Sequence, residues 1–367
     1  MTDVDFHALA NNYIRHLIPY QPGKPIEEVE RELAISSIIK LASNENPLGA
    51  SNAALQAAEQ ALLKAHLYPD GGCYELKQTL AMFLQVIPTQ LTLGNGSENV
   101  LEMITKAYLT VGDSAVISEY AFLTIPLLIK SYGAEIISTP ANKFGHDIKK
   151  MVDAVKKNTR IIFIVNPNNP TGTYTKKDEL IYLLESIPAN ILVVVDEAYH
   201  EYIECADYPD TLALLKKYPN LVITRTFSKA YGLAGLRLGY AISSPIIADI
   251  LNRARLPFNV NTVAAYAAKA ALLDQDHIAK SVILNKEGRQ QLADGLKKLN
   301  LHFIPSLGNF ISFDARQDAN QIYQKLLYKG IIVRPLHAYH MPTYLRVTIG
   351  TFTQNEKFLT ALQEVLT

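Results

Sequence analysis

A lysine that can act as a nucleophile, Lys229, lies in the segment Thr224–Arg237, which reads TRTFSKAYGLAGLR and follows a predicted strand. A lysine amine becomes nucleophilic where burial or a neighbouring cation lowers its pKa. The hydroxyls of Thr226 and Ser228 and the guanidinium of Arg237 can hold a phosphate beside that amine. A lone lysine after a strand is usually an ordinary surface residue, but the complete run SKAYGLAGLRLG favours a nucleophile next to a phosphate-bearing ligand.

An acidic residue, Asp196, ends the apolar run VVVD, and Tyr199 follows it three residues later. Open α/β sheets bind ligands at the carboxyl ends of their strands. At that edge Asp196 can pair with a protonated ring nitrogen of a cofactor that serves as an electron sink, and Tyr199 can donate to a ring oxygen. Asp196 can equally cap a following helix, and the pattern alone does not separate the two interpretations.

The segment NPNNPTG, residues 166–172, also follows an apolar run, Ile161–Val165. Two Asn-Pro steps and a glycine are strong signals for a turn. A turn at the edge of the sheet also directs Asn169 toward the ligand cleft, where its amide can bind a ligand oxygen. The two interpretations are compatible.

A glycine-rich segment, GNGSEN, precedes the helical stretch VLEMITKAYL. Small residues there let the backbone approach an anion, which the N–H groups at the start of that helix can then bind. Glycine-rich helix starts are common, so the signal gains weight only when other anion-binding groups converge on it.

Apolar, β-branched runs of four or five residues predict the strands that position these groups. They lie at 115–118, 161–165, 192–195 and 221–224. Such runs are typical of strands buried on both faces, and their spacing fits strand–helix–strand units. The segment TKKDELIYLLES predicts an amphipathic helix with Thr175 as its N-cap. We therefore expect an α/β domain with a mostly parallel, seven-stranded type of sheet between layers of helices.

The pattern changes after Leu256 and predicts a smaller α+β domain. A long helical stretch, AAYAAKAALL to GLKKL, is expected to contain two helices. Short strands are expected at 310–313, 330–333 and 345–349, followed by a terminal helix at 354–366. The expected organisation is an N-terminal segment, 1–45, that packs on the small domain and a partner, a large domain, 46–256, and a small domain, 257–367.

Composition excludes several classes of function. Hydrophobic residues make up 49% of the chain and charged residues 19%, which is a globular balance. Lys and Arg number 35, as do Asp and Glu, so no broad positive field is available for nucleic acid or an anionic membrane. Cys73 and Cys205 have no ligand-spaced neighbours, which argues against a metal site. We expect reduced thiols and a cytoplasmic location, since no signal or membrane-spanning segment is evident.

Taken together, the motifs NPNNPTG, VVVDEAY, SKAYGLAGLRLGY and YLRVTIG resemble those of the fold-type I pyridoxal-phosphate enzymes, in their aminotransferase class. The resemblance extends over essentially the whole chain. Within that class the chain looks most like the histidinol-phosphate aminotransferase family. Three further segments, LIPYQPGKP, LASNENPLG and YPDGG, carry that closer resemblance.

The resemblance implies a role for each residue at the ring of pyridoxal 5′-phosphate. Lys229 would form a Schiff base with the cofactor and then serve as general base and acid. Asp196 would pair with the ring nitrogen, while Asn169 and Tyr199 would bind the ring hydroxyl oxygen. An aromatic residue stacks on the ring in this family, and it would be Phe122, with Tyr120 as the alternative.

The resemblance also implies a phosphate site that is shared between subunits. Main-chain N–H groups and side chains of one subunit would bind the phosphate: Gly96, Ser97, Glu98, Thr226, Ser228 and Arg237. Tyr68 would reach the same phosphate from the partner chain of a homodimer.

At the substrate end, Arg346 in YLRVTIG matches the family's carboxylate-binding arginine, with Asn169, Arg334 and Tyr20 as further substrate-binding residues. The implied reaction converts L-histidinol phosphate and 2-oxoglutarate into imidazole-acetol phosphate and L-glutamate, in histidine biosynthesis and by ping-pong kinetics. An aromatic amino acid aminotransferase and a threonine-phosphate decarboxylase are alternatives of the same fold. A non-catalytic, cofactor-binding regulator is disfavoured because no basic DNA-binding segment is evident.

Overall fold

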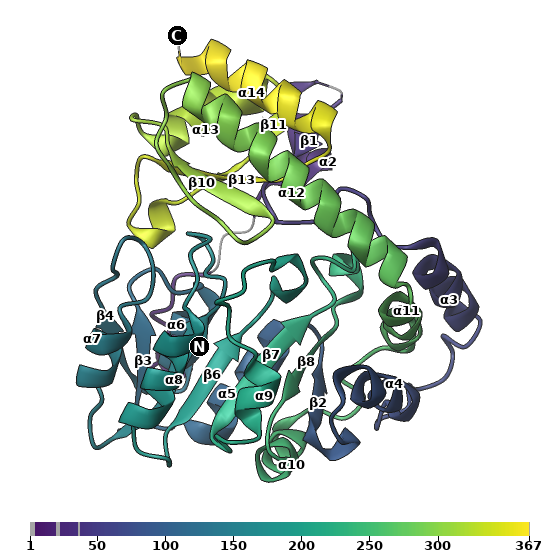
Figure 1. Cartoon of the computed structure of the whole chain (residues 1–367), viewed down its shortest axis with the longest axis vertical. Coiled ribbons are helices and arrows are strands. Elements are labelled where there is room, and N and C mark those ends of the chain that lie inside the picture. Colours follow the sequence, from purple (N-terminus) through teal and green to yellow (C-terminus); the bar gives the residue numbers. More distant parts are fainter. Residues whose placement is uncertain (1–3, 20–22, 36, 367) are drawn as a thin grey trace.

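A seven-stranded sheet forms the centre of the larger of two domains in the computed structural model, which describes residues 4–19, 23–35 and 37–366 (Figure 1). The strand order is β2-β8-β7-β6-β5-β3-β4. All neighbours pair in parallel except β8, which is antiparallel to both β2 and β7. The strands are β2 (Leu91–Gly94), β3 (Ser114–Ser118), β4 (Glu135–Thr139), β5 (Thr159–Val165), β6 (Leu192–Asp196), β7 (Leu221–Thr226) and β8 (Gly239–Ile242).

The sheet is buried on both faces, as the apolar runs predicted. Along β6, Val193 and Val195 belong to one hydrophobic core, whereas Leu192 and Val194 belong to the core on the opposite face. Successive side chains of a strand point to opposite faces, so a strand between two cores must be apolar at every position. The mostly parallel sheet and the four predicted strands are therefore confirmed.

Two layers of helices cover the sheet. Cores on its two faces include residues of α3, α4, α7, α8, α9 and α11 on one side and of α5, α6 and α10 on the other. These helices are α3 (Asn52–Leu62), α4 (Tyr74–Leu84), α5 (Ser97–Tyr108), α6 (Thr124–Ser131), α7 (Ile148–Asp153), α8 (Lys177–Ser186), α9 (Thr211–Leu215), α10 (Pro245–Ala254) and α11 (Thr262–Leu273).

The expected N-cap of α8 is wrong. The cap is Lys176, whose N–H donates to the Glu179 carboxylate over 2.8 Å. Thr175 is buried, and its own N–H donates to Asn166 Oδ1 over 2.8 Å. Thr175 therefore closes the loop before α8 through its contact with Asn166 and does not cap the helix.

The smaller domain packs an antiparallel sheet, in the order β12-β13-β10-β9, against long helices (Figure 1). Its strands are β9 (Phe303–Ile304), β10 (Phe310–Asp314), β12 (Arg334–Pro335) and β13 (Tyr344–Thr348). Its helices are α12 (Gln275–Lys298), α13 (Ala319–Tyr328) and α14 (Phe352–Leu366). Short 3₁₀ helices lie at Pro88–Gln90, His200–Tyr202, Ala234–Leu236 and His337–Tyr339. The long helical stretch is thus two helices, α11 and α12, as expected.

The N-terminal segment contacts both domains. Helix α2 (Ile26–Leu33) buries Val29 against Leu327 and Ile332, and β1 (Ile39–Lys40) pairs in parallel with β11 (Ile331–Ile332) of the small domain. Upstream, α1 (Phe6–Leu9) leads into Tyr13, whose ring lies against the large domain at Gly133. The expected packing of 1–45 on a partner stays a prediction.

Packing favours a later domain boundary than the expected one at residue 257. The alanine-rich face of α11 belongs to the core of the large domain, and so does Ile278 in α12. Leu292, further along α12, belongs to the core of the small domain. We therefore place the boundary inside α12. Within the described ranges, no helix is both long and apolar enough to cross a membrane.

Candidate active site

The carboxyl ends of β5, β6 and β7 open into a cavity of about 260 Å³ at the contact with the small domain. Asp196 is the last residue of β6, and Asn169 and Lys229 come from the loops that follow β5 and β7, as the position of ligand sites in open α/β sheets predicts. The residues that line it are Gly23, Ala42, Ser43, Asn44, Glu45, Ser97, Glu98, Phe122, Val165, Asn169, Asp196, Ala198, Tyr199, Thr226, Ser228, Lys229, Ala234, Arg237, Arg334, Tyr339 and Arg346.

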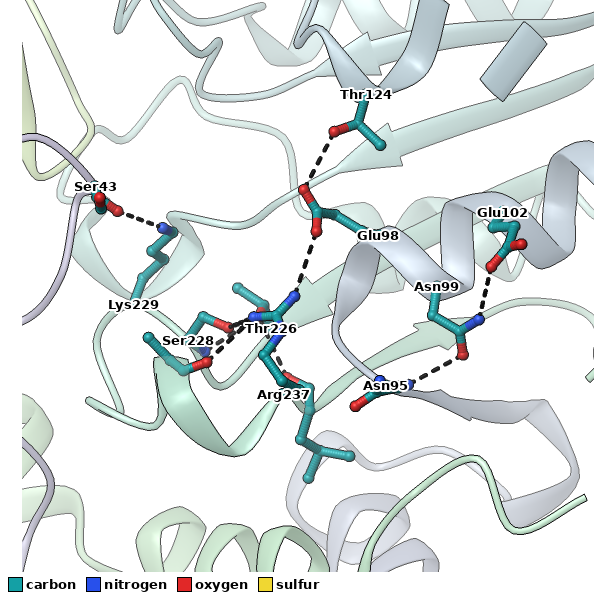
Figure 2. A network of polar contacts seen from close by, with 12 residues as sticks. Ser43, Asn95, Glu98, Asn99, Glu102, Thr124, Thr226, Ser228, Lys229 and Arg237 are labelled. Carbon is teal, nitrogen blue, oxygen red and sulfur yellow. Dashed lines mark hydrogen bonds and ion pairs between the residues drawn. The ribbon is translucent and has the colours of Figure 1, made fainter. Parts of the chain in front are cut away.

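Lys229 is half-buried, and its Nζ donates to the main-chain oxygen of Ser43 over 3.1 Å (Figure 2). Burial lowers the pKa of this amine from 10.5 to about 8, and the positive charge of Arg346 lowers it further in the same direction. The neutral fraction near neutral pH is therefore much larger than that of an ordinary lysine. Such an amine is suited to nucleophilic attack and to proton transfer.

Asp196 is buried at the end of β6, where its Oδ1 accepts a hydrogen bond from Thr224 Oγ1 over 2.8 Å. Burial raises the pKa of this carboxyl from 3.8 to about 6. The next element is a 3₁₀ helix whose N-cap is Tyr199, so Asp196 caps no helix. Of the two interpretations of Asp196, the position favours pairing with a protonated ring nitrogen over capping a helix.

Tyr199 is held by the N-terminal segment of the chain. The side-chain amide of Asn44 donates to the Tyr199 hydroxyl over 2.9 Å, and the Tyr199 ring meets the edge of Phe310 with centroids 5.3 Å apart. Sequence reasoning recognised the motif LASNENPLG but gave no role to Asn44 or to the Ser43 carbonyl. Their partners lie more than 150 residues away in sequence, and a local pattern does not identify such partners.

Asn169 and Arg346 join the two domains across the cavity. One terminal nitrogen of the Arg346 guanidinium donates to Asn169 Oδ1, and the other donates to the main-chain oxygen of Ala42 over 2.8 Å. The guanidinium also lies 5.3 Å from the centre of the Phe310 ring. Arg334 on β12 is paired in register with Arg346 on β13, so the two arginines line the same end of the cavity.

A second group of lining residues, here called the anion cup, is formed by the start of helix α5 with Thr226, Ser228 and Arg237 (Figure 2). Arg237 Nη1 donates to Ser228 Oγ over 3.4 Å, and the Ser228 N–H donates to Thr226 Oγ1 over 3.1 Å. Helix α5 begins beside this group, at Gly96, which has a φ of +86° and makes no side-chain capping bond. A Cβ on Gly96 would lie 2.5 Å from Arg237 Nη2, so only glycine lets the guanidinium approach the start of the helix.

These features fit pyridoxal 5′-phosphate. Uncapped N–H groups at a helix N-terminus, two hydroxyls and a guanidinium suit a phosphate. A buried carboxyl whose pKa is raised suits a protonated ring nitrogen, and a lysine whose pKa is lowered suits a bond to an aldehyde. The three features surround one cavity, so one molecule can engage all of them.

The aromatic candidates occupy different places. Phe122 lines the cavity, whereas Tyr120 packs on Phe144 with ring centroids 5.9 Å apart and is not a lining residue. Tyr68 is 83% exposed, stacks on Phe258 with centroids 4.9 Å apart and does not line the cavity of its own chain. Tyr20 lies outside the described residues.

Comparisons with known proteins agree on one family. Residues 36–362 match the model for aminotransferase class I and II. The chain is 51% identical over 364 residues to "histidinol-phosphate aminotransferase 2" of Pseudomonas fluorescens Pf-5, covering 99% of this chain and 98% of the relative. It is 47% identical to "histidinol-phosphate aminotransferase 1" of Nitrosococcus oceani, covering 100% and 99%.

Solved structures share the fold. Histidinol-phosphate aminotransferase from Sinorhizobium meliloti, in complex with pyridoxal-5′-phosphate, superposes with a TM-score of 0.89 at 27% identity, covering 97% of each chain. An aspartate aminotransferase mutant from Thermus thermophilus gives a TM-score of 0.84 at 19% identity, covering 97% of this chain and 99% of the other.

Proposed function

The chain belongs to the class I and II aminotransferases and, within them, to the histidinol-phosphate aminotransferases, and from this membership we propose its reaction and the residues that perform it. The enzyme is a transaminase that uses pyridoxal 5′-phosphate. Its amino donor is L-histidinol phosphate and its acceptor is 2-oxoglutarate, which gives imidazole-acetol phosphate and L-glutamate in histidine biosynthesis. The two substrates use the cavity in turn, in the cytoplasm.

Lys229 and Asp196 divide the proton chemistry. Bound pyridoxal phosphate supplies a conjugated pyridinium ring that delocalises the charge left when a proton leaves the substrate carbon. Lys229 Nζ takes that proton and returns it, because its pKa of about 8 allows both forms near neutral pH. Asp196 would hold the proton of the ring nitrogen from the end of β6. Asn169 and Tyr199 would bind the ring oxygen, and Phe122 would contact the ring.

The pair of Arg346 and Arg334 selects the substrate. Both arginines line the cavity, and a guanidinium binds carboxylate and phosphate alike. The same pair can therefore hold the carboxylate of glutamate in one half-reaction and the phosphate of histidinol phosphate in the other. Tyr20 is a further substrate-binding candidate.

The observation that carries the proposal is the placement of Lys229, Asp196 and Arg346 around one cavity. A panel of amino donors tests it, with purified enzyme, 2-oxoglutarate and glutamate formation as the readout. We expect kcat/KM for histidinol phosphate to exceed that for phenylalanine. A reversed preference would identify an aromatic amino acid aminotransferase, and release of CO₂ from threonine phosphate would identify a decarboxylase.

A homodimer with shared active sites is the arrangement we propose for this chain. Tyr68 is exposed and does not line the cavity of its own chain, and exposed apolar residues precede it in sequence at Leu62, Leu63 and Leu67. A large exposed apolar surface is typical of a protein–protein contact. A second copy would bury this surface and bring the Tyr68 hydroxyl to the partner's phosphate cup.

Mixing two inactive or weakened variants tests the shared site. Tyr68→Phe is expected to weaken cofactor retention in its own homodimer, because one donor to the phosphate is lost. After unfolding and refolding with Lys229→Ala chains, each heterodimer would contain one site with both Lys229 and Tyr68. We therefore expect cofactor retention and turnover to reappear in about half of the sites of the heterodimers. Refolded single variants serve as controls, and a mixture no more active than their average would contradict the shared site.

A further inference from the structure

A carboxylate lies inside the anion cup. Glu98 occupies the first turn of α5, and its side chain is 49% exposed. Its Oε2 accepts from Arg237 Nη2 over 3.4 Å, and its Oε1 accepts from Thr124 Oγ1 over 3.2 Å (Figure 2). The Thr124 contact ties the carboxylate to the start of α6 and fixes it beside the guanidinium.

The Glu98 carboxylate contacts the Arg237 guanidinium, which is the group that would bind a phosphate. Arg237 Nη1 already donates to Ser228 Oγ and to the Ala234 main-chain oxygen, the latter over 3.2 Å. Nη2 is the terminal nitrogen that reaches Glu98. A phosphate bound at the N-terminus of α5 must therefore share Nη2 with Glu98 or displace it. The bound phosphate would also lie close to the negative charge of the Glu98 carboxylate.

We propose that Glu98 is an internal counter-anion of the cup, which pairs with Arg237 and competes with the cofactor phosphate for that guanidinium. The inference deepens the proposed function, since it concerns the phosphate of the same cofactor. The main-chain N–H and the side chain of Glu98 then have opposite effects, because the N–H binds the phosphate and the carboxylate weakens that binding.

The charge of Glu98 also affects two other groups of the cavity. Burial has the largest effect on both pKa values, since it raises that of the Asp196 carboxyl and lowers that of the Lys229 amine. The negative charge of Glu98 raises both pKa values. Glu98 therefore faces the ligand space and not only bulk solvent. A negative charge placed there acts on any anion that enters the cup.

Glu98→Gln tests the proposal in the cofactor-free, full-length protein. The amide keeps an oxygen for Thr124 and loses the negative charge. Calorimetric titrations with inorganic phosphate and with pyridoxal phosphate are expected to give dissociation constants about 5- to 10-fold lower than those of the wild type, at low salt. The difference should shrink as salt is raised, because both charges are partly exposed to solvent.

Glu102→Gln is the matched control. Glu102 lies one turn further along α5, accepts from Asn99 Nδ2 over 3.0 Å and does not line the cavity (Figure 2). It changes the net charge by the same amount, so we expect less than a twofold effect on either ligand. Glu98→Ala is a second test variant, which should bind phosphate at least as tightly as the wild type.

Several outcomes would overturn the proposal. Phosphate affinity in Glu98→Gln equal to that in Glu102→Gln would show that the carboxylate does not compete, and weaker affinity in both Glu98 variants would show that it supports the cup. Tighter phosphate binding together with a failed histidinol-phosphate assay would retain the counter-anion and reject only the proposed substrate.

Discussion

Lys229→Ala is expected to reduce transamination by at least about 10⁴-fold, because one side chain supplies both the nucleophile and the general base. Among the described residues that line the cavity, Lys229 is the one lysine, so no neighbouring amine can replace it. Steady-state turnover of histidinol phosphate and the visible absorbance band of the bound cofactor are the two readouts. Both should be lost together.

The fold should survive this substitution. The Lys229 amine donates to the Ser43 main-chain oxygen, and burial disfavours its charged form. The urea midpoint of the cofactor-free protein should therefore change little. Lys286→Ala is the control, since Lys286 pairs with Glu204 on an exposed surface and should remain fully active. An active Lys229→Ala enzyme with normal absorbance would reject the assignment.

The sequence was most informative where neighbouring residues share one constraint. The run LVVVD predicted a strand buried on both faces, since it is short, rich in β-branched residues and bounded by turns. Its last residue then had to lie at the ligand-binding edge, and Asp196 does line the cavity. Lys229 and Asn169, which also follow predicted strands, line the same cavity, and their roles stay predictions.

Contacts between distant segments were beyond this reasoning. Asn44 reaches Tyr199, and Arg346 reaches Asn169, only because the N-terminal segment and the small domain fold over the edge of the large sheet. Periodicity reports which face of an element is apolar and contains no information on such pairings. The family resemblance supplied Arg346, but the pairing itself required the structure.

Two further differences between the expected and the observed structure, in the N-cap of α8 and in the place of α11, have local causes. Thr175 has the residue type of an N-cap, yet the Asn166 side chain binds both its N–H and its C=O, and this closed loop leaves Lys176 as the cap. Helix α11 continues the helical pattern that leads into the small domain. Its alanines nevertheless pack on α3, because small side chains allow close approach of two helices.

A buried ion pair below the cavity was also missed. Glu197 follows Asp196 directly and is fully buried, and its Oε2 lies 2.8 Å from Arg225 Nη2 and 2.9 Å from Arg225 Nε. Its Oε1 accepts from Thr211 Oγ1 over 2.9 Å. The pair therefore joins the ends of β6 and β7, which carry Asp196 and lead to Lys229.

Arg225→Met is expected to lower the free energy of unfolding by about 3–5 kcal/mol, since it leaves the Glu197 charge buried and uncompensated. Urea unfolding of the cofactor-free protein at fixed concentration measures the change. Adding Glu197→Gln to Arg225→Met should recover part of the loss, because the remaining buried group is then neutral. That recovery distinguishes an unpaired charge from a simple packing defect.

Arg253→Met provides the comparison with an exposed pair. Arg253 contacts Asp249 over 2.7 Å, but both side chains are more than half exposed, so its loss should cost less than about 1 kcal/mol. Equal losses for Arg225→Met and Arg253→Met would mean that the buried pair contributes no more than a surface one. A double variant as unstable as Arg225→Met would likewise show that the Glu197 charge is not the cause. In either case, the Glu197–Arg225 pair would not be what stabilises the ends of β6 and β7.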